Sequence, residues 1–220
     1  MHKLLYFVFC SYYTVAMRGE WATFDYEQKA RGAGFGIIAG IDEVGRGAVA
    51  GPVTVGLVVL PDDFHVPVTD SKLLSPAQRA EKAALIREAA VICEVMHIEA
   101  DFIDRHGIIA AQREAVQRIW EQIDPLPSYV LLDGRHDFTG LGGAARVQTI
   151  IRGDQKSVSI AAASIVAKHA RDELMRRHAL MYPEYGFEIH VGYGTRAHLE
   201  ALQRHGPSPL HRRTFLQKYL

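Results

Sequence analysis

The chain has 220 residues, 48% of them hydrophobic, and its 25 basic and 25 acidic residues give a formal charge of zero. This size and balance fit one sizeable folded domain and exclude a highly charged, disordered chain. The two cysteines, Cys10 and Cys93, are too few for a disulfide framework or a zinc cluster, and they favour a reducing, cytoplasmic location.

The first 35 residues are expected to form an N-terminal extension. An apolar run from Leu4 to Cys10 follows Lys3 and resembles the core of a secretion signal, but it is too short to span a bilayer. A second methionine, Met17, precedes a polar stretch. We therefore expect residues 1–16 to be a misassigned start or a disordered segment, with an export signal as the less favoured alternative.

The next part of the chain predicts strands followed by a helix. Apolar residues bounded by glycine run from 36 to 43, and a second run, rich in β-branched residues, covers 52–60. The two are expected to pair as a hairpin. Ser75 and Pro76 are typical of the N-cap and first position of a helix, which would continue to about residue 90. Residues 91–99 predict another strand.

Helices and strands then alternate. Residues 101–120 predict one helix, whose apolar side would be Ile103, Ile108, Ala111, Ala115, Val116 and Ile119. Residues 129–133 and 147–151 predict strands, and residues 157–182 and 196–205 predict helices. The pattern indicates an α/β fold in which helices flank a central mixed sheet. The main domain would span residues 36–194, and residues 195–220 would form a small C-terminal helical extension.

Acidic residues stand at the ends of two predicted strands. Asp42 and Glu43 close the first strand before the Gly45-Arg46-Gly47 turn, and Asp133 closes the run that begins at residue 129. Because ligands of open α/β sheets bind beyond the strand ends, these carboxylates are expected to share one site. Structural alternatives remain for the two aspartates. Asp42 could pair with an Arg at a turn, and Asp133 could belong to an ordinary Asp-Gly turn.

A fourth carboxylate, Asp154, precedes the long helix predicted from residue 157. Capping of that helix would explain Asp154 when it is considered alone. Four carboxylates in one site would repel one another strongly unless cations were bound. Their hard oxygen ligands favour Mg²⁺ or Mn²⁺ over Zn²⁺, and two such ions suit the hydrolysis of a phosphodiester.

The charges are unevenly distributed along the chain. Residues 1–143 carry 13 basic and 19 acidic residues, whereas residues 144–220 carry 12 and 6. A basic C-terminal third can face a polyanion such as a nucleic acid, although solvated charged helix faces are an equally ordinary explanation.

Residues 36–215 resemble the bacterial ribonuclease HII family, within the type 2 ribonucleases H. The resemblance rests on motifs that occur in family order: IDEVGRG at 41–47, DSK at 70–72, LDG at 132–134, GD at 153–154, SIAAASIVAK at 159–168, RD at 171–172, YGF at 185–187, GYGT at 192–195, HL at 198–199, HG at 205–206 and HRRTF at 211–215. It implies a ribonuclease H-like fold and cleavage of RNA in RNA–DNA hybrids, including 5′ incision at single ribonucleotides in duplex DNA during ribonucleotide excision repair.

The resemblance also assigns roles to residues. Asp42, Glu43, Asp133 and Asp154 would be the catalytic set that binds two Mg²⁺ or Mn²⁺ ions. Asp172 competes for the fourth place, but its spacing from Lys168 suits an ion pair on the surface of a helix.

By the same resemblance, six further residues would bind the substrate. Gly45, Arg46 and Gly47 would recognise the ribose, and Tyr193 would pack against the sugar, since a 2′-OH is both donor and acceptor. Lys72 and Arg212 would contact phosphates. The expected partners are RNA–DNA hybrids and ribonucleotide-containing duplex DNA, without a membrane, and the protein is expected to be a monomer.

Two alternatives stay open. A different two-metal nuclease of the same fold, such as a resolvase, would cut DNA structures without needing a ribose. A nucleic-acid-binding module without catalysis would use only the basic C-terminal third, although the four carboxylates argue against it.

Overall fold

The computed structural model describes residues 21–217 and residue 219, so the prediction for residues 1–16 lies outside the described range. The described chain contains a five-stranded mixed sheet in the order β3-β2-β1-β4-β5. β1, β2 and β3 pair antiparallel, as the predicted hairpin requires, whereas β4 is parallel to both β1 and β5. The strands are β1 (Ile38–Val44), β2 (Val53–Val59), β3 (Ile92–Ile98), β4 (Tyr129–Asp133) and β5 (Arg146–Ile150).

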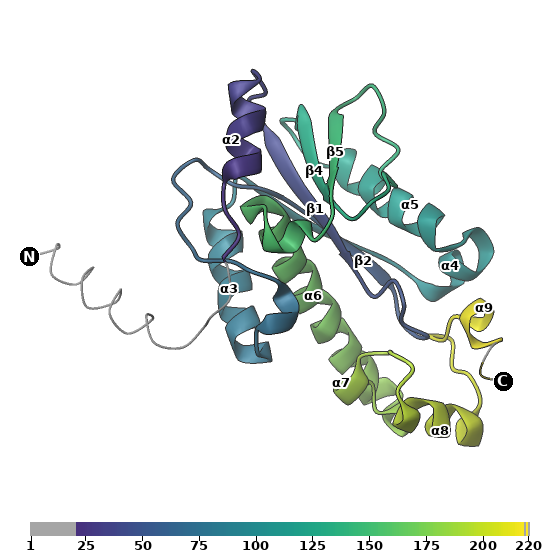
Figure 1. Ribbon diagram of the computed structural model, residues 1–220. Helices are drawn as coiled ribbons and strands as arrows, with labels where there is room; N and C mark the ends of the chain where they lie inside the picture. The colour runs from purple at the N-terminus through teal and green to yellow at the C-terminus, as the bar shows by residue number, and fades with distance from the viewer. Residues whose placement is uncertain (1–20, 218, 220) are drawn as a thin grey trace, which may run out of the picture.

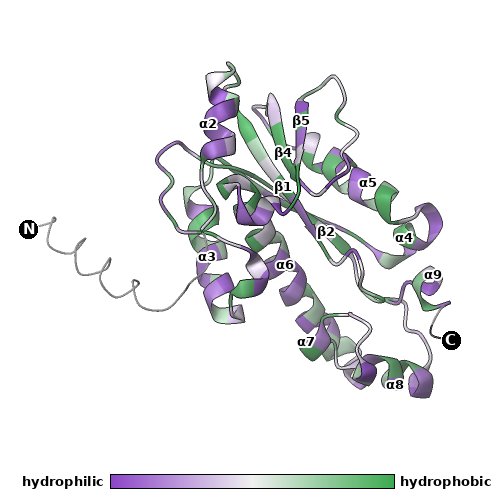
Figure 2. Cartoon of the chain, in the orientation of Figure 1, coloured by the Kyte–Doolittle hydropathy of each residue, from purple (hydrophilic) through white to green (hydrophobic). Residues whose placement is uncertain are grey.

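Helices cover both faces of this sheet (Figure 1). One apolar cluster joins α4 and α5 to the strands, and a second joins α3 and α6 to the opposite face. Both polar and apolar residues occur along α3 and α5 (Figure 2), as expected for helices that are buried on one side only. The helices are α2 (Asp25–Gly32), α3 (Pro76–Ala89), α4 (Ala100–His106), α5 (Ile108–Trp120), α6 (Val158–Met181), α7 (Phe187–His190), α8 (Arg196–His205) and α9 (Arg213–Leu216).

The long helix α6 packs unusually close to the centre of the sheet. A Cβ atom on Gly40 of β1 would lie 2.1 Å from the backbone carbon of Ser159, and one on Gly56 of β2 would lie 2.6 Å from the carbonyl oxygen of Ala163. Glycine in the strands and alanine on the helix therefore let the two backbones approach. This close packing brings the middle of α6 to the end of β1, where Asp42 and Glu43 lie.

One prediction about the elements was wrong, and one helix was not predicted. The helix expected over residues 101–120 is divided into α4 and α5 at Gly107, whose φ of +83° favours glycine and ends the first helix. Helix α2 falls within the predicted N-terminal extension. It is anchored by Ala30 in an apolar cluster and by buried Glu27, whose carboxylate accepts hydrogen bonds from the Ser157 hydroxyl and the Ser159 amide. At least this part of the extension is therefore integral to the fold.

The C-terminal part is helical, as predicted. α8 begins at Arg196 and ends at His205, with Gly206 after it. Leu202 of α8 and Leu216 of α9 pack with Val49, which lies in the connection between β1 and β2. The Arg212 amide also donates to the Val49 carbonyl oxygen at 2.9 Å. The C-terminal segment thus supports the same loop that carries the Gly45-Arg46-Gly47 turn.

Candidate active site

The carboxylates at the ends of β1 and β4 lie together at one edge of the sheet. The two strands pair in parallel as far as Ile41 opposite Leu132, so Asp42, Glu43 and Asp133 lie just beyond the last pair. β1 remains paired with β2 as far as Val44, although Asp42 and Glu43 are consecutive in this strand. Both still line one cleft of about 440 Å³ together with Asp133, because pairing with β4 has ended there.

Asp154 comes to the same site from the segment that follows β5. It lies in a short 3₁₀ turn, η2 (Gly153–Gln155), while the N-cap of α6 is Ser157, whose hydroxyl accepts from the Ile160 amide. The capping explanation for Asp154 is therefore wrong. The neighbouring Gly153 amide donates to Asp133 Oδ1 at 2.6 Å, and this bond fixes η2 against the end of β4.

The site concentrates negative charge in a buried place. Burial, and then the charges of Glu43 and Asp133, raise the pKa of Asp42 well above its ordinary value. Burial and the charge of Asp133 raise the pKa of Glu43 to about 7. For Asp154, burial and then the charge of Asp70 raise the pKa to about 6. Without bound cations, these carboxylates therefore repel one another.

Lys72 and Arg46 are cations that face this group, and Arg46 Nη1 lies 3.7 Å from Glu43 Oε1. Lys72 lies in η1 (Ser71–Leu73), with its Nζ atom 4.0 Å from Asp154 Oδ2 and 3.9 Å from Asp70 Oδ1. Burial lowers the pKa of Lys72, but attraction to Asp70 and Asp154 outweighs this effect and raises it overall. Because the Lys72 and Arg46 side chains are 77% and 56% exposed, solvent screens both cations, and two such groups do not neutralise four carboxylates.

The donor set fits a divalent cation. Glu43 Oε2 is buried without a hydrogen-bond partner, and oxygen ligands with excess negative charge are those that Mg²⁺ and Mn²⁺ prefer. Among residues 21–217 and 219, no three carboxylate, imidazole or thiol groups already lie close enough to hold one ion. Asp42, Glu43, Asp133 and Asp154 are the residues that could hold such ions.

Tyr193 lines the cleft, and the glycine-flanked turn directly follows Val44, which lines it too. Gly45 is buried and has a φ of +82°, and a Cβ atom there would lie 2.1 Å from Arg171 Nε. Arg46 and Gly47 are exposed. Tyr193 lines the cleft with its ring centroid 5.5 Å from the Arg171 guanidinium carbon and 5.9 Å from Lys168 Nζ. The residues expected to recognise the sugar therefore lie beside the carboxylates.

The structure corrects the expectation for Arg212. Its side chain is fully buried and donates to the carbonyl oxygens of Gly51 at 2.9 Å and Arg46 at 3.0 Å. Burial, followed by repulsion from Arg171, lowers its pKa to about 9. Arg212 thus supports the backbone behind the Gly45-Arg46-Gly47 turn and does not present its guanidinium to a phosphate.

Asp172 pairs with Lys168, as the spacing predicted, but the pair is not on the surface. Asp172 is only 5% exposed, and it accepts from Lys168 Nζ at 2.6 Å and from Arg79 Nη1 at 3.1 Å. Both carboxylate oxygens are thereby used in ion pairs. Asp172 is therefore a bridge between α3 and α6.

Three polar residues in or near the cleft were not predicted to belong to the site. The hydroxyls of Ser71 and Ser164 lie 3.0 Å apart, both line the cleft, and a hydrogen bond from Ser164 opposes the rise in the pKa of Asp42. Gln112 of α5 is fully buried, and neither its amide nitrogen nor its amide oxygen has a hydrogen-bond partner among the described residues. Gln112 carries a signal that could have been noticed, since it is a polar residue on the apolar side of a helix.

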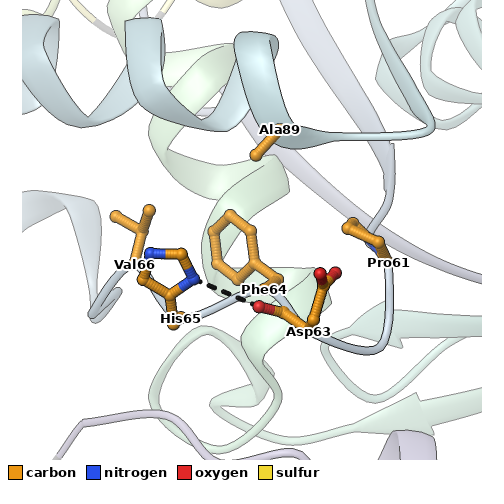
Figure 3. A pocket seen from close by; sticks show the side chains of 6 residues that line it. All are labelled: Pro61, Asp63, Phe64, His65, Val66 and Ala89. Atoms are coloured by element: carbon orange, nitrogen blue, oxygen red, sulfur yellow. Dashed lines mark hydrogen bonds between the residues drawn. The ribbon is translucent and has the colours of Figure 1, made fainter. Parts of the chain in front are cut away.

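A second hollow, of about 240 Å³, lies away from the carboxylates and is mostly lined by apolar side chains (Figure 3). In it His65 Nδ1 contacts the carbonyl oxygen of Asp63 at 3.1 Å. No set of polar groups converges there among the residues that line it. The carboxylate cleft is therefore the candidate active site.

The fold and its acidic cleft define the ribonuclease H class of nucleases. The family model described as Ribonuclease HII matches residues 39–218. Ribonuclease HII of Bacillus licheniformis is 44% identical over 202 residues, which cover 91% of this chain and 78% of the relative, and that of Bacillus subtilis is 43% identical over the same shares. The chain belongs to the ribonuclease HII family, and it is a ribonuclease that hydrolyses phosphodiester bonds.

Solved structures agree with this assignment. The ribonuclease H2 from Pyrococcus horikoshii OT3 superposes with a TM-score of 0.72 at 27% identity, over 84% of this chain and 97% of that protein. The predicted resemblance and the ribonuclease H-like fold are thereby confirmed. Within the described residues, no helix has the length and apolar character that crossing a membrane requires.

Proposed function

We propose that this ribonuclease hydrolyses the RNA strand of RNA–DNA hybrids and incises duplex DNA 5′ to single ribonucleotides, using two divalent cations. The observation that supports the proposal best is the meeting of two sets of groups on one cleft. Asp42, Glu43 and Asp133 line the cleft together with Tyr193, Asp154 lies 4.0 Å from Lys72 of the same cleft, and Arg46 of the Gly45-Arg46-Gly47 turn lies 3.7 Å from Glu43. One cleft can thus combine hydrolysis with recognition of a sugar.

Divalent cations held by Asp42, Glu43, Asp133 and Asp154 would lower the pKa of a bound water and stabilise charge on the leaving oxygen. The protein's own residues would orient the substrate. Exposed Lys72 would contact a phosphate, and the backbone of the Gly45-Arg46-Gly47 turn can meet both the donor and the acceptor of a 2′-OH. The Tyr193 ring would pack against the sugar.

Hydrolysis by water makes the 3′ oxygen of the preceding nucleotide the leaving group, so the products carry a 3′-OH and a 5′-phosphate. The 2′-OH is recognised but is not the nucleophile. We further propose that the protein acts as a cytoplasmic monomer in ribonucleotide excision repair.

The test compares three labelled substrates: duplex DNA with one ribonucleotide, an RNA–DNA hybrid and duplex DNA alone. Each is incubated with purified protein with and without Mg²⁺ or Mn²⁺, and the ends of the products are mapped. We expect metal-dependent cleavage of the first two, with 5′ incision at the ribonucleotide. Cleavage without metal, or equal cleavage of pure DNA, would contradict the proposal and favour a nuclease that does not need a ribose.

A further inference from the structure

Three buried histidines lie close together behind Tyr193. They are His190 at the end of α7, His198 on α8, and His211 before α9. The rings of His190 and His198 are stacked with centroids 4.2 Å apart, and His198 Nε2 lies 3.0 Å from His211 Nε2. None of the three lines the carboxylate cleft. The proposed chemistry gives these histidines no role, yet their nitrogens are all paired.

The partners fix which nitrogen carries each proton. The carbonyl oxygen of Tyr193 can only accept, so His198 Nδ1, at 2.9 Å, must donate. A neutral His198 then has an unprotonated Nε2, which accepts from His211 Nε2. The remaining nitrogen, His211 Nδ1, must accept, and the backbone amide of Ser208 donates to it at 3.0 Å. The partners at both ends of this series of hydrogen bonds therefore require the same direction, in which His211 donates to His198 and His198 donates to the Tyr193 carbonyl.

The surroundings keep the pair neutral. Burial, with added repulsion from His190, lowers the pKa of His198 to about 4, and burial with repulsion from His198 does the same for His211. A second proton on His211 would break the hydrogen bond that Nδ1 accepts from the Ser208 amide and would leave only the Ser208 hydroxyl, at 2.9 Å, as an acceptor. A second proton on His198 would face the N–H of His211. The ordered, neutral state is therefore the one that satisfies the contacts.

The chain of hydrogen bonds ends on the backbone of Tyr193. The Tyr193 carbonyl accepts from His198 and from the Thr195 amide at 2.8 Å, and its amide donates to the His190 carbonyl at 2.9 Å. On the preceding residue, the carbonyl of Gly192 accepts from the Val49 and Ala50 amides, which follow the Gly45-Arg46-Gly47 turn. The position of the Tyr193 ring thus depends on a backbone that the histidines hold from behind.

We propose that His198 and His211 are positioning residues whose ordered hydrogen-bond chain holds the main chain of Tyr193, so that its ring meets the sugar at the cleavage site. This inference rests on the proposed function only through the role of Tyr193. It predicts that the direction of one donated hydrogen bond, and not merely the volume of the His198 side chain, controls how well a ribonucleotide in DNA is recognised.

A pair of variants separates these two effects. His198→Asn keeps a donor near the position of Nδ1, whereas His198→Leu is close in size but cannot donate to the Tyr193 carbonyl. We expect H198L to lower kcat/KM on the single-ribonucleotide duplex by about tenfold, because small displacements of substrate-positioning groups cost rate. H198N should retain most of the wild-type kcat/KM. The exposed His205 of the same helix offers a matched control, H205L, which should behave as the wild type.

The inference fails if H198L matches the wild type, or if H198N and H198L lose the same amount. Long-range ¹H–¹⁵N NMR of the wild-type histidines tests the chain without any substrate. We expect the proton on Nδ1 of His198 and on Nε2 of His211, and the opposite assignment for His198 would overturn the inference. A wild type that does not incise at a ribonucleotide would instead contradict the proposed function, so the two failures are distinguishable.

Discussion

The two sides of the cleft differ in how their charges are balanced. On the carboxylate side, burial and mutual repulsion raise the pKa values of Asp42, Glu43 and Asp154. On the Tyr193 side, the buried arginines Arg171 and Arg212 donate to backbone carbonyls. The carboxylates of the first side repel one another unless cations bind. The arginines of the second side have their hydrogen-bond acceptors within the protein. Changes on the first should therefore affect turnover, and changes on the second should affect folding and substrate choice.

The largest expected effect is the loss of turnover in Asp42→Asn. This change would remove a proposed cation ligand, and we expect kcat to fall by about a thousandfold or more. The same change removes repulsion from a buried site, so the thermal midpoint of the metal-free protein should rise. Asp62→Asn, at an exposed carboxylate paired with Arg31, is the matched control. Normal turnover in D42N would reject the ligand role.

Substitution of Asp154 should affect turnover, whereas substitution of Asp172 should affect stability. Asp154→Asn should reduce turnover as D42N does without loss of stability. Asp172→Asn breaks a buried bridge to Arg79 and Lys168, which costs about 3 kcal/mol of unfolding free energy. At a temperature where D172N is folded, we expect its kcat to stay within about tenfold of wild type. Denaturant unfolding and single-turnover cleavage measure both quantities, and a fully stable but inactive D172N would reverse the assignment.

Substitutions of Gly45 and Gly47 test how tightly the turn packs on the Tyr193 side of the cleft. Gly45→Ala would place a methyl group 2.1 Å from Arg171 Nε at a φ of +82°, so we expect a loss of at least about 3 kcal/mol of unfolding free energy. At Gly47 a Cβ atom meets nothing within 4 Å. Gly47→Ala should therefore change stability by less than about 0.5 kcal/mol. Equal destabilisation by the two variants would mean that Arg171 does not brace this turn.

The metal-free protein should become less stable as pH rises from about 4 to about 7. The folded-state pKa values of Glu43 and Asp154, about 7 and about 6, lie above their ordinary values of 4.5 and 3.8. The folded protein therefore binds more protons than the unfolded chain in this interval, and its stability falls with increasing pH. Mg²⁺ should restore stability most at the upper end. Thermal unfolding at several pH values measures this, and D42N should show a shallower dependence.

Much of this architecture was predictable, since regular elements leave periodic signals in sequence. The apolar runs predicted β1, β2, β3 and β4 to within about two residues, and Ser75 with Pro76 predicted the start of α3. The strand-end carboxylates followed from the same patterns. Helix α2 left no such signal, because its main anchor is a buried Glu27 whose partners lie more than 100 residues away in the sequence.

The roles of single side chains were harder to predict, because burial depends on tertiary contacts. Arg212 looked like an exposed phosphate ligand in a basic segment, yet the carbonyls that it holds belong to Gly51 and Arg46. The spacing of Asp172 from Lys168 predicted an ion pair on the surface, but Arg79 of α3 also donates to Asp172 and the pair is buried. The order of protons along His198 and His211 needs atomic distances, so no sequence pattern could have indicated it.

The smallest expected effect separates Lys72 from Arg212. Lys72→Met removes an exposed ammonium, so stability should hardly change, while binding to an RNA–DNA hybrid should weaken a few-fold and the slope of log affinity against log salt should decrease by about one. Arg212→Met leaves the Gly51 and Arg46 carbonyls without their donor, so it should lower stability and leave the salt slope unchanged. Binding titrations at several salt concentrations distinguish them. A reduced slope in R212M would restore Arg212 as a phosphate contact and would weaken the division between the two sides of the cleft.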